Sequence, residues 1–297
     1  MKIIYNPIFL EHNQGNDHPE NPERIESLVS ELESHEGYYN AIKARNGHKF
    51  LELAHSLEYI QEVIQESISE GSLAPDTPLD ENSYDVACYA VGASIMAAKL
   101  ALQGENAFAL VRPPGHHAHA DWSHEFCVFN NMAIAAIYLQ SKGKRVAIID
   151  VDAHLGDGTA DIINSFDDIL YISSHQDGIF PRDEYDDGIN EALAPETSGE
   201  EFIQSHWKRM LRRVGEFKPD IIGLSLGTDA HGEDNIEGRI KGVDLRFAYE
   251  TYQEIKQDIE DLGLPYFIIL EGGYNPEVLT ECFHFLRENS KVSSSTA

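Results

Sequence analysis

The sequence is poor in basic residues, cysteine and long apolar runs, and each shortage excludes a class of protein. Among 297 residues only 22 are Lys or Arg, against 51 Asp or Glu, which gives a formal net charge of −29. A field of that sign repels nucleic acid and anionic membrane surfaces and attracts cations. An acidic surface also serves solubility alone, so the charge suggests cationic partners without identifying one.

The three cysteines, Cys88, Cys127 and Cys282, are odd in number and widely spaced, which excludes a disulfide framework. The first residues lack a basic segment followed by a long apolar run, so we expect no signal peptide. No stretch approaches the ~20 apolar residues that span a bilayer. We therefore expect a cytoplasmic protein that binds neither membranes nor nucleic acid. No feature of the sequence indicates an oligomeric state.

Short apolar runs alternate with longer segments of helical periodicity. Hydrophobic residues make up 42% of the chain, enough for a large core. The runs at 2–5, 108–111, 145–150, 169–173, 221–226 and 266–270 predict buried strands, and the segments at 56–68, 84–102, 130–142, 200–217 and 244–262 predict helices. This alternation is typical of a mostly parallel sheet covered by helices on both faces. We expect one α/β domain over residues 1–290, with 291–297 as a flexible tail.

Polar side chains follow five of these strands. They belong to the segments "RPPGHH" at 112–117, "DVDAHLGDG" at 150–158, "SH" at 174–175, "GTDAH" at 227–231 and "EGGY" at 271–274. In open parallel sheets, ligands bind at the carboxyl ends of the strands. We therefore expect these groups, which titrate or bind metals, to converge on one cleft.

Asp152 and His154 are two residues apart, so at an extended strand end they face the same way. Asp229, which follows another strand, is the candidate third ligand. One imidazole and two carboxylates with open positions suit a catalytic Zn²⁺, and Fe²⁺ is a second candidate. The alternative is structural, with Asp150 as a strand-end cap and Asp157 at a helix N-terminus.

Adjacent His116 and His117 face different directions, so they suit proton transfer better than a shared ligand site. Each imidazole needs a partner that fixes its tautomer, and Asp150 and Asp157 are available for these two roles. Tyr274 follows two glycines that allow close backbone approach, and in this company its phenol is a candidate oxyanion donor. The other histidines considered are expected to be supporting or surface residues: His119, His124, His175 and His231.

The motifs "RPPGHHA", "FCVFNN", "DVDAHLGDG", "SLGTDAH" and "EGGYN", in this order, resemble the histone deacetylase superfamily. That superfamily includes acetoin-utilization proteins and acetylpolyamine amidohydrolases. "HPENPER" at 18–24 and "AHSLEYI" at 54–60 resemble its N-terminal motifs. The resemblance implies an arginase-like, three-layer α/β/α fold and a zinc-dependent deacetylase. The acidic composition favours cationic amines, so acetyl-lysine and acetylpolyamines are both candidate substrates.

The resemblance also implies a role for each matching position. Asp152, His154 and Asp229 match the zinc ligands. The matches in the proton-transfer and oxyanion machinery are His116, His117 as general base and acid, Asp150, Asp157 and Tyr274. Phe126 and Phe180 match the aromatic tunnel walls, and Gly115, Gly272 and Gly273 are expected to line the substrate site. Arg24 matches an arginine behind the site, and Asp150, Ser173 and Ser174 match a structural K⁺ site.

Two positions depart from the family pattern. Leu155 replaces a histidine that usually follows the ligand histidine, and we expect no effect on ligation. Glu125 replaces a glycine and is expected to narrow or charge the tunnel entrance. Two other functions remain open. A ureohydrolase of the same fold needs further bridging carboxylates, where this chain has Gly156 and Gly227. A catalytically silent protein that binds acyl-lysine or a regulatory partner is the second alternative, and Glu125 is the feature that favours it.

Overall fold

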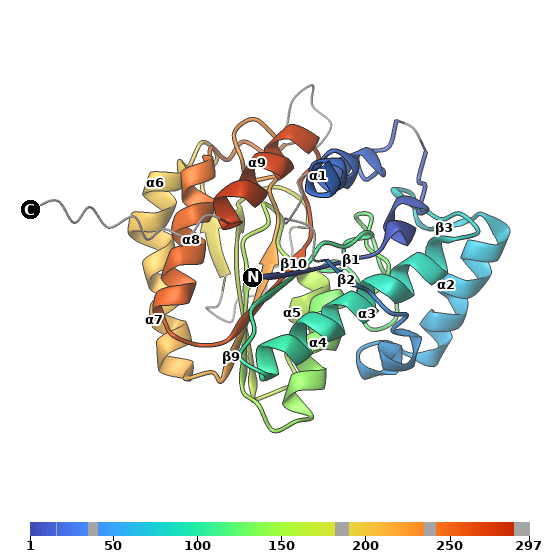
Figure 1. Cartoon of the computed structure of the whole chain (residues 1–297), viewed down its shortest axis with the longest axis horizontal. Coiled ribbons are helices and arrows are strands. Elements are labelled where there is room, and N and C mark those ends of the chain that lie inside the picture. Colours follow the sequence, from blue (N-terminus) through green and yellow to red (C-terminus); the bar gives the residue numbers. More distant parts are fainter. Residues whose placement is uncertain (16, 35–40, 182–189, 235–241, 288–297) are drawn as a thin grey trace, which may run out of the picture.

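The computed structural model describes residues 1–15, 17–34, 41–181, 190–234 and 242–287. Its centre is an eight-stranded, entirely parallel sheet with strand order β2-β1-β5-β10-β9-β6-β7-β8 (Figure 1). The predicted tail, 291–297, lies outside the described residues. The sheet strands are β1 (Lys2–Tyr5), β2 (Ile42–Lys43), β5 (Ala107–Ala109), β6 (Val146–Asp150), β7 (Ile169–Gln176), β8 (Asn190–Leu193), β9 (Ile221–Leu226) and β10 (Tyr266–Leu270).

The central strands form where apolar, β-branched residues are continuous, because both faces of the sheet are covered. Strands β1, β9 and β10 have the predicted bounds, whereas β5 ends two residues early. Strand β7 continues to Gln176, so Ser174 and His175 lie inside it and not after it. The short edge strands β2 and β8 were not predicted. Strand β2 has only two residues, and the sequence of β8, "NEAL", is not a continuous apolar run.

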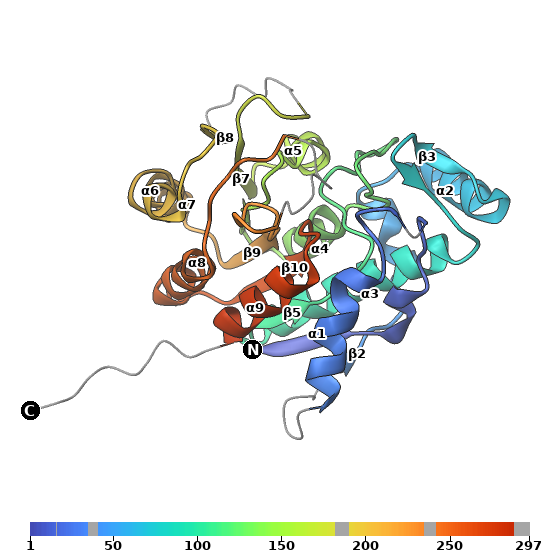
Figure 2. The same ribbon diagram turned by 90° about the horizontal axis from the view of Figure 1, so that it is seen from above.

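Helices cover both faces of the sheet and complete the expected three layers (Figure 2). Helices α3 (Ser83–Leu102), α4 (Asn131–Gln140) and α5 (Asp157–Ile163) lie on one side. The other side carries α1 (Glu23–Ser34), α7 (Lys208–Phe217), α8 (Tyr249–Asp261) and α9 (Pro276–Arg287). Helix α2 (Leu57–Ser69) packs on α3.

Helix α3 corrects one expectation from the sequence. Its 20 residues are long and apolar enough to cross a membrane by length and composition, although no such stretch was expected. In the fold, 67% of its most apolar 18-residue stretch is buried, and the helix packs against α4, β5 and β10. The helix lacks a polar face because it lies between the sheet and other helices, which makes it a core helix.

The remaining elements are short. They are the 3₁₀ helices at Pro7–Leu10 and His48–Leu53, the hairpin of β3 (Ser72–Ala74) and β4 (Thr77–Pro78), and α6 (Gly199–Glu201). The helix predicted at 200–217 is broken by a π-helical segment, Phe202–Trp207, before α7 begins.

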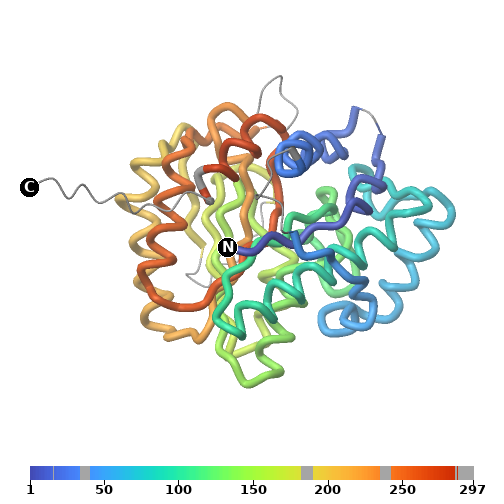
Figure 3. The backbone as a smooth tube through the Cα atoms, viewed as in Figure 1, coloured from blue at the N-terminus to red at the C-terminus, as the bar shows by residue number. Residues whose placement is uncertain are grey.

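The topology brings distant parts of the chain together at the middle of the sheet. Strand β1 lies inside the sheet, between β2 and β5, and β5 pairs on its other side with β10 (Figure 3). Strand β6 pairs with both β9 and β7. Because all these strands are parallel, the segments that follow them meet at one edge, where the polar motifs were expected.

Candidate active site

The predicted metal ligands lie together just beyond strands β6 and β9. Nδ1 of His154 lies 3.1 Å from Oδ1 of Asp152 and 2.9 Å from Oδ2 of Asp229. Backbone groups hold the outer oxygens, because Gly272 donates its N–H to Oδ2 of Asp152 and Ala153 donates to Oδ1 of Asp229. The two inner oxygens therefore converge on one imidazole nitrogen.

The charges of this trio favour a cation. Burial alone would lower the pKa of His154, but hydrogen bonds to Asp152 and Asp229 raise it to about 10. Burial and the charge of Asp152 raise the pKa of Asp229, whereas the neighbouring imidazoles hold the pKa of Asp152 well below its usual range. A divalent ion could replace the His154 proton, and one ligand atom from each residue lies within 4.8 Å of the others. The donor set therefore fits Zn²⁺ or Fe²⁺.

Glycine is required where the last motif approaches the trio. A Cβ on Gly272 would lie 2.5 Å from Oδ2 of Asp152 and 2.8 Å from Oδ2 of Asp229. Gly273 has φ of +110°, and a Cβ there would collide with the hydroxyl of Thr228. Side chains at these positions would push the "EGGY" segment away from the ligands, which explains the two successive glycines.

Each of the adjacent histidines has its own carboxylate. Nδ1 of His116 lies 3.1 Å from Oδ2 of Asp150, and Nδ1 of His117 lies 2.7 Å from Oδ1 of Asp157. The ring centres of the two histidines are 4.0 Å apart, and the ring of His117 is 6.2 Å from that of His154. The structure thus brings both predicted pairs beside the metal-ligand trio.

The two imidazoles differ in charge. Burial disfavours protonation of His116, but Asp152 and Asp150 outweigh it and raise its pKa well above the ordinary value. Burial and the charge of His116 lower the pKa of His117 to about 3. At neutral pH His117 is therefore a neutral imidazole that can accept a proton beside a positively charged neighbour.

Tyr274 is held by contacts to its ring and backbone. The Arg24 guanidinium lies 4.8 Å from its ring centre, and the ring of Phe126 packs edge-on at 5.7 Å. Asp234 accepts the backbone N–H at 2.9 Å. Among the described residues, the phenol hydroxyl has no hydrogen-bond partner, and burial raises the pKa of Tyr274 well above its ordinary value. The hydroxyl is therefore a neutral donor that is free to bind another group.

A buried ion network from "HPENPER" supports this segment, and sequence reasoning found only part of it. Arg24 donates 2.6 Å hydrogen bonds to the carbonyls of Gly273 and Glu271 and pairs with Glu20 at 3.0 Å. Glu20 also binds Arg112. Burial opposes ionisation of Glu20, yet Arg112 and Arg24 lower its pKa to about 2. Glu20 stands four positions before Arg24, which was expected behind the site, and this spacing was the signal in the sequence.

Glu271 was predicted only as a strand-end residue, but its carboxylate holds the loop that carries the histidines. It accepts backbone N–H groups from Gly115 at 2.8 Å and His116 at 3.1 Å, and the hydroxyl of Ser225 at 3.1 Å. Tyr171, on β7, was also missed, and its hydroxyl binds Asp150 at 2.9 Å. Both residues fix the groups that orient His116.

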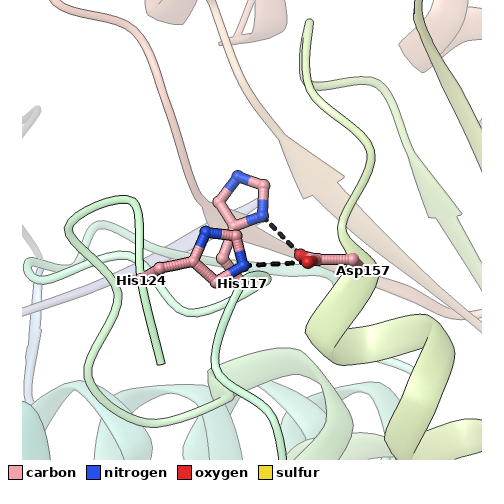
Figure 4. Close-up of side chains that lie close together, drawn as sticks. All are labelled: His117, His124 and Asp157. Carbon is pink, nitrogen blue, oxygen red and sulfur yellow. Dashed lines mark hydrogen bonds and ion pairs between the residues drawn. The ribbon is translucent and has the colours of Figure 1, made fainter. Parts of the chain in front are cut away.

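The histidines assigned to supporting or surface roles fall into two groups. His119 and His124 are buried and bind Oδ2 of Asp157 through their Nε2 atoms, at 3.2 and 2.8 Å (Figure 4 shows His124). His175 lies within β7, and His231 stacks on Tyr249. His119 and His124 therefore belong to the immediate surroundings of the site.

The two predicted aromatic walls differ in exposure. Phe126 is buried against Tyr274 and the ring of His18, whereas Phe180 is 55% exposed and packs edge-on against His124 at 5.1 Å. Glu125, beside Phe126, has φ of +47°, a conformation that suits the glycine usual in the family. Its backbone N–H contacts Asp76 at 3.3 Å.

Glu125 and Asp76 place two acidic groups near the ligand histidine. Burial and the charge of Asp76 raise the pKa of Glu125, and His154 and His124 act against this rise. Neither carboxylate forms an ion pair with a Lys or Arg among the described residues. That Glu125 narrows or charges a tunnel entrance remains a prediction. Leu155, the other departure, is buried.

The three residues predicted to hold K⁺ lie on neighbouring strands. Asp150 pairs with Ser173 in the β6–β7 register, and the Ser174 hydroxyl contacts the Asp150 carbonyl at 3.4 Å. All three are buried. A K⁺ ion at this position remains a prediction.

Comparisons with known proteins agree with this geometry. The family model for the histone deacetylase domain matches residues 18–288 of this sequence. A probable deacetylase from Archaeoglobus fulgidus is 33% identical over 93% of this chain and 81% of its own length. Acetylpolyamine amidohydrolase 1 from Pseudomonas aeruginosa is 34% identical over 70% of this chain and 62% of its own length.

Solved structures show the same fold. The HD domain of HDA15 has a TM-score of 0.87 at 27% identity, covering 96% of this chain and 87% of that one. An acetylpolyamine aminohydrolase from Burkholderia pseudomallei has a TM-score of 0.84 at 25% identity, covering 96% and 97%. The fold prediction is confirmed, and the named relatives support hydrolase activity of the deacetylase type. The chain belongs to the histone deacetylase family.

Proposed function

We propose that this protein is a single-metal deacetylase that hydrolyses the amide of N-acetylated cationic amines. The observation that carries the proposal is the convergence of the inner oxygens of Asp152 and Asp229 on His154, with a neutral imidazole beside them. These three residues would hold the metal, with zinc as the first candidate and Fe²⁺ as the second. A divalent ion there supplies Lewis-acid polarisation of an amide carbonyl and lowers the pKa of water from 15.7 towards ~7.

His117 performs the proton transfers in this mechanism. Asp157 accepts the Nδ1–H of His117, which leaves the lone pair of His117 on Nε2. Nε2 takes one proton from water as the oxygen attacks the acyl carbon. The same proton is then delivered to the amide nitrogen as the C–N bond breaks, releasing amine and carboxylic acid.

His116 and Tyr274 stabilise charge. His116, held by Asp150, contributes electrostatic stabilisation beside His117. The neutral phenol of Tyr274 has no competing partner among the described residues and can donate to the developing oxyanion. Glu271 and Arg24 hold the segments that carry these two side chains. His116 and Tyr274 are therefore each held in place by a separate residue, Glu271 and Arg24 respectively.

The substrate class follows from charge. The chain carries a net charge of −29, and Glu125 and Asp76 lie near the site without a basic partner among the described residues. Acetylated polyamines keep free ammonium groups, and acetyl-lysine peptides of basic sequence carry neighbouring cations, so both can place a cation beside these carboxylates. The amidohydrolase relatives support acetylated amines as a class.

The test is hydrolysis of a panel of N-acetylpolyamines, acetyl-lysine peptides and longer acyl-lysines by protein reconstituted with one equivalent of Zn²⁺ or Fe²⁺. We expect acetyl-group hydrolysis that a chelator abolishes, and a loss of roughly 10²–10⁴ in kcat for His117→Ala. Wild-type turnover by His117→Ala would refute the mechanism.

The same panel separates the alternatives. Tight binding of acyl-lysine by metal-loaded protein, without hydrolysis of any substrate, would identify a silent binder. Activity on guanidino substrates with two bound metals per chain would identify a ureohydrolase. We expect close to one metal per chain.

A further inference from the structure

One carboxylate of the site, that of Asp157, is hydrogen-bonded to three imidazoles. Oδ1 of Asp157 binds Nδ1 of His117 at 2.7 Å, and Oδ2 binds Nε2 of His124 at 2.8 Å and Nε2 of His119 at 3.2 Å. Figure 4 shows His117 and His124 converging on this carboxylate. Pairing with His117 alone uses only one of its two oxygens, so the other two imidazoles require a separate explanation.

We propose that His119 and His124 are positioning residues of the general base: by occupying Oδ2 of Asp157 they hold Oδ1 on Nδ1 of His117. The inference rests on the proposed function, in which His117 is that base. Neither histidine is assigned to the reaction itself. They act through Asp157, which is fixed on both of its oxygens.

The hydrogen-bond pattern assigns a proton to each ring. His119 contacts carboxylates through both nitrogens, Asp157 through Nε2 and Asp161 through Nδ1 at 3.1 Å, so it donates from both. His124 donates from Nε2, because its buried Nδ1 has no partner among the described residues. His117 donates from Nδ1. All three donors point at acceptor oxygens, and Nε2 of His117 is left with the lone pair that the reaction needs.

The cluster also joins two parts of the fold. All three imidazoles come from one loop, residues 112–130, whereas Asp157 and Asp161 lie one turn apart on α5. His119 connects both carboxylates and so fixes the loop to the helix at two points. This arrangement leaves Asp157 little freedom to rotate away from His117, because a rotation would break three hydrogen bonds at once.

Trp122 covers the cluster from outside. Its indole stacks on His119 at 4.0 Å and 12° and on His124 at 5.0 Å and 15°. The indole is 47% exposed, whereas both imidazoles beneath it are buried. The hydrogen bonds to Asp157 are therefore shielded from water, which strengthens them. Asp161, at the outer end, is half exposed.

Matched amide substitutions test the proposal. Glutamine places an amide N–H near the position of Nε2, whereas the shorter asparagine reaches only the position of Nδ1. His124→Gln and His119→Gln therefore retain the donor to Asp157, and His124→Asn and His119→Asn lose it. We expect the Gln variants to keep kcat within about threefold of wild type. The Asn variants should lose kcat about tenfold each, with KM and metal content unchanged.

A second readout is independent of activity. The Nδ1–H of His117, hydrogen-bonded to Asp157, should give a downfield imidazole proton signal, assigned by its absence in His117→Gln. We expect this signal to persist in the Gln variants and to broaden by exchange with water in the Asn variants. Urea denaturation of each Gln/Asn pair shows whether the two variants are matched in stability.

The outcomes separate the two hypotheses. Equal kcat and equal proton signals within each Gln/Asn pair would overturn the positioning role. A wild-type protein that hydrolyses no acetylated amine would refute the proposed function, and the proton signal would still decide whether His119 and His124 hold Asp157 on His117.

Discussion

Removing the phenol oxygen of Tyr274 should separate activity from stability. The contacts that hold this residue are the Arg24 guanidinium on its ring, the edge of Phe126 and the backbone hydrogen bond to Asp234. Tyr274→Phe preserves all three. Its hydroxyl has no partner to lose among the described residues, so we expect the free energy of unfolding to change by less than about 0.5 kcal/mol.

The effect on catalysis should be far larger. If the hydroxyl donates to the oxyanion, its loss removes one preorganised donor from a buried site. Such donors contribute about 2.7–4 kcal/mol to transition-state stabilisation, which corresponds to roughly 10²–10³ in kcat. KM should change little, because the interaction strengthens only as charge develops on the oxygen.

The assay is steady-state hydrolysis of an N-acetylated diamine, with metal content and urea denaturation measured on the same preparation. Tyr252→Phe is the matched control, because the Tyr252 hydroxyl is buried without a partner among the described residues. Its removal should leave kcat unchanged and raise stability by up to about 1 kcal/mol. A Tyr274→Phe enzyme with kcat within threefold of wild type would refute the oxyanion role.

Three further predictions concern metal, charge and support. His154 has a pKa of about 10 in the metal-free fold, above its ordinary value of 6.5, so its proton stabilises that fold fully below pH 6.5 and the contribution is lost as pH rises through 10. Because metal displaces this proton, metal affinity from competition titrations should rise about tenfold per pH unit between about 7 and 9; a pH-independent affinity would contradict this. Glu125→Gln should lower kcat/KM about fivefold for an N-acetyl diamine but not for a neutral N-alkylacetamide of equal length, and an equal loss on both would exclude a charge effect. Arg24→Met removes one of two cations from buried Glu20 and should cost about 3 kcal/mol in urea denaturation; a cost below about 1 kcal/mol would show that Arg112 suffices.

The fold was predictable where local and global signals agree. The buried strands at 221–226 and 266–270 are continuous apolar runs of the right length, and the structure has them with the same bounds. The edge strand at 190–193 is polar and forms through backbone pairing with β7, which no side-chain pattern reveals. The π-helical segment at 202–207 likewise keeps a helical pattern while its backbone bonds change.

The arrangement of the candidate site was predictable because parallel strands end at one edge. This rule brought together Asp152, His154 and Asp229 from strands that pair in the sheet. It did not reveal the roles of Glu271 and Asp234, whose carboxylates accept backbone N–H groups, with Glu271 also accepting the Ser225 hydroxyl. Partners of that kind depend on how loops pack, which a single sequence does not encode in a recognisable pattern.

The bonds from Arg24 to the Gly273 and Glu271 carbonyls have a consequence for biosynthesis. Strand β5 is flanked by β1, which is synthesised before it, and by β10, which is synthesised only after β6, β7, β8 and β9. While the ribosome is still elongating the chain, β5 therefore has an open edge, and Arg24 and Glu20 are already present without the carbonyls that Arg24 will bind. The exposed edge of β5 can pair with other chains until β10 inserts beside it. We therefore expect dependence on chaperones to be greatest late in translation.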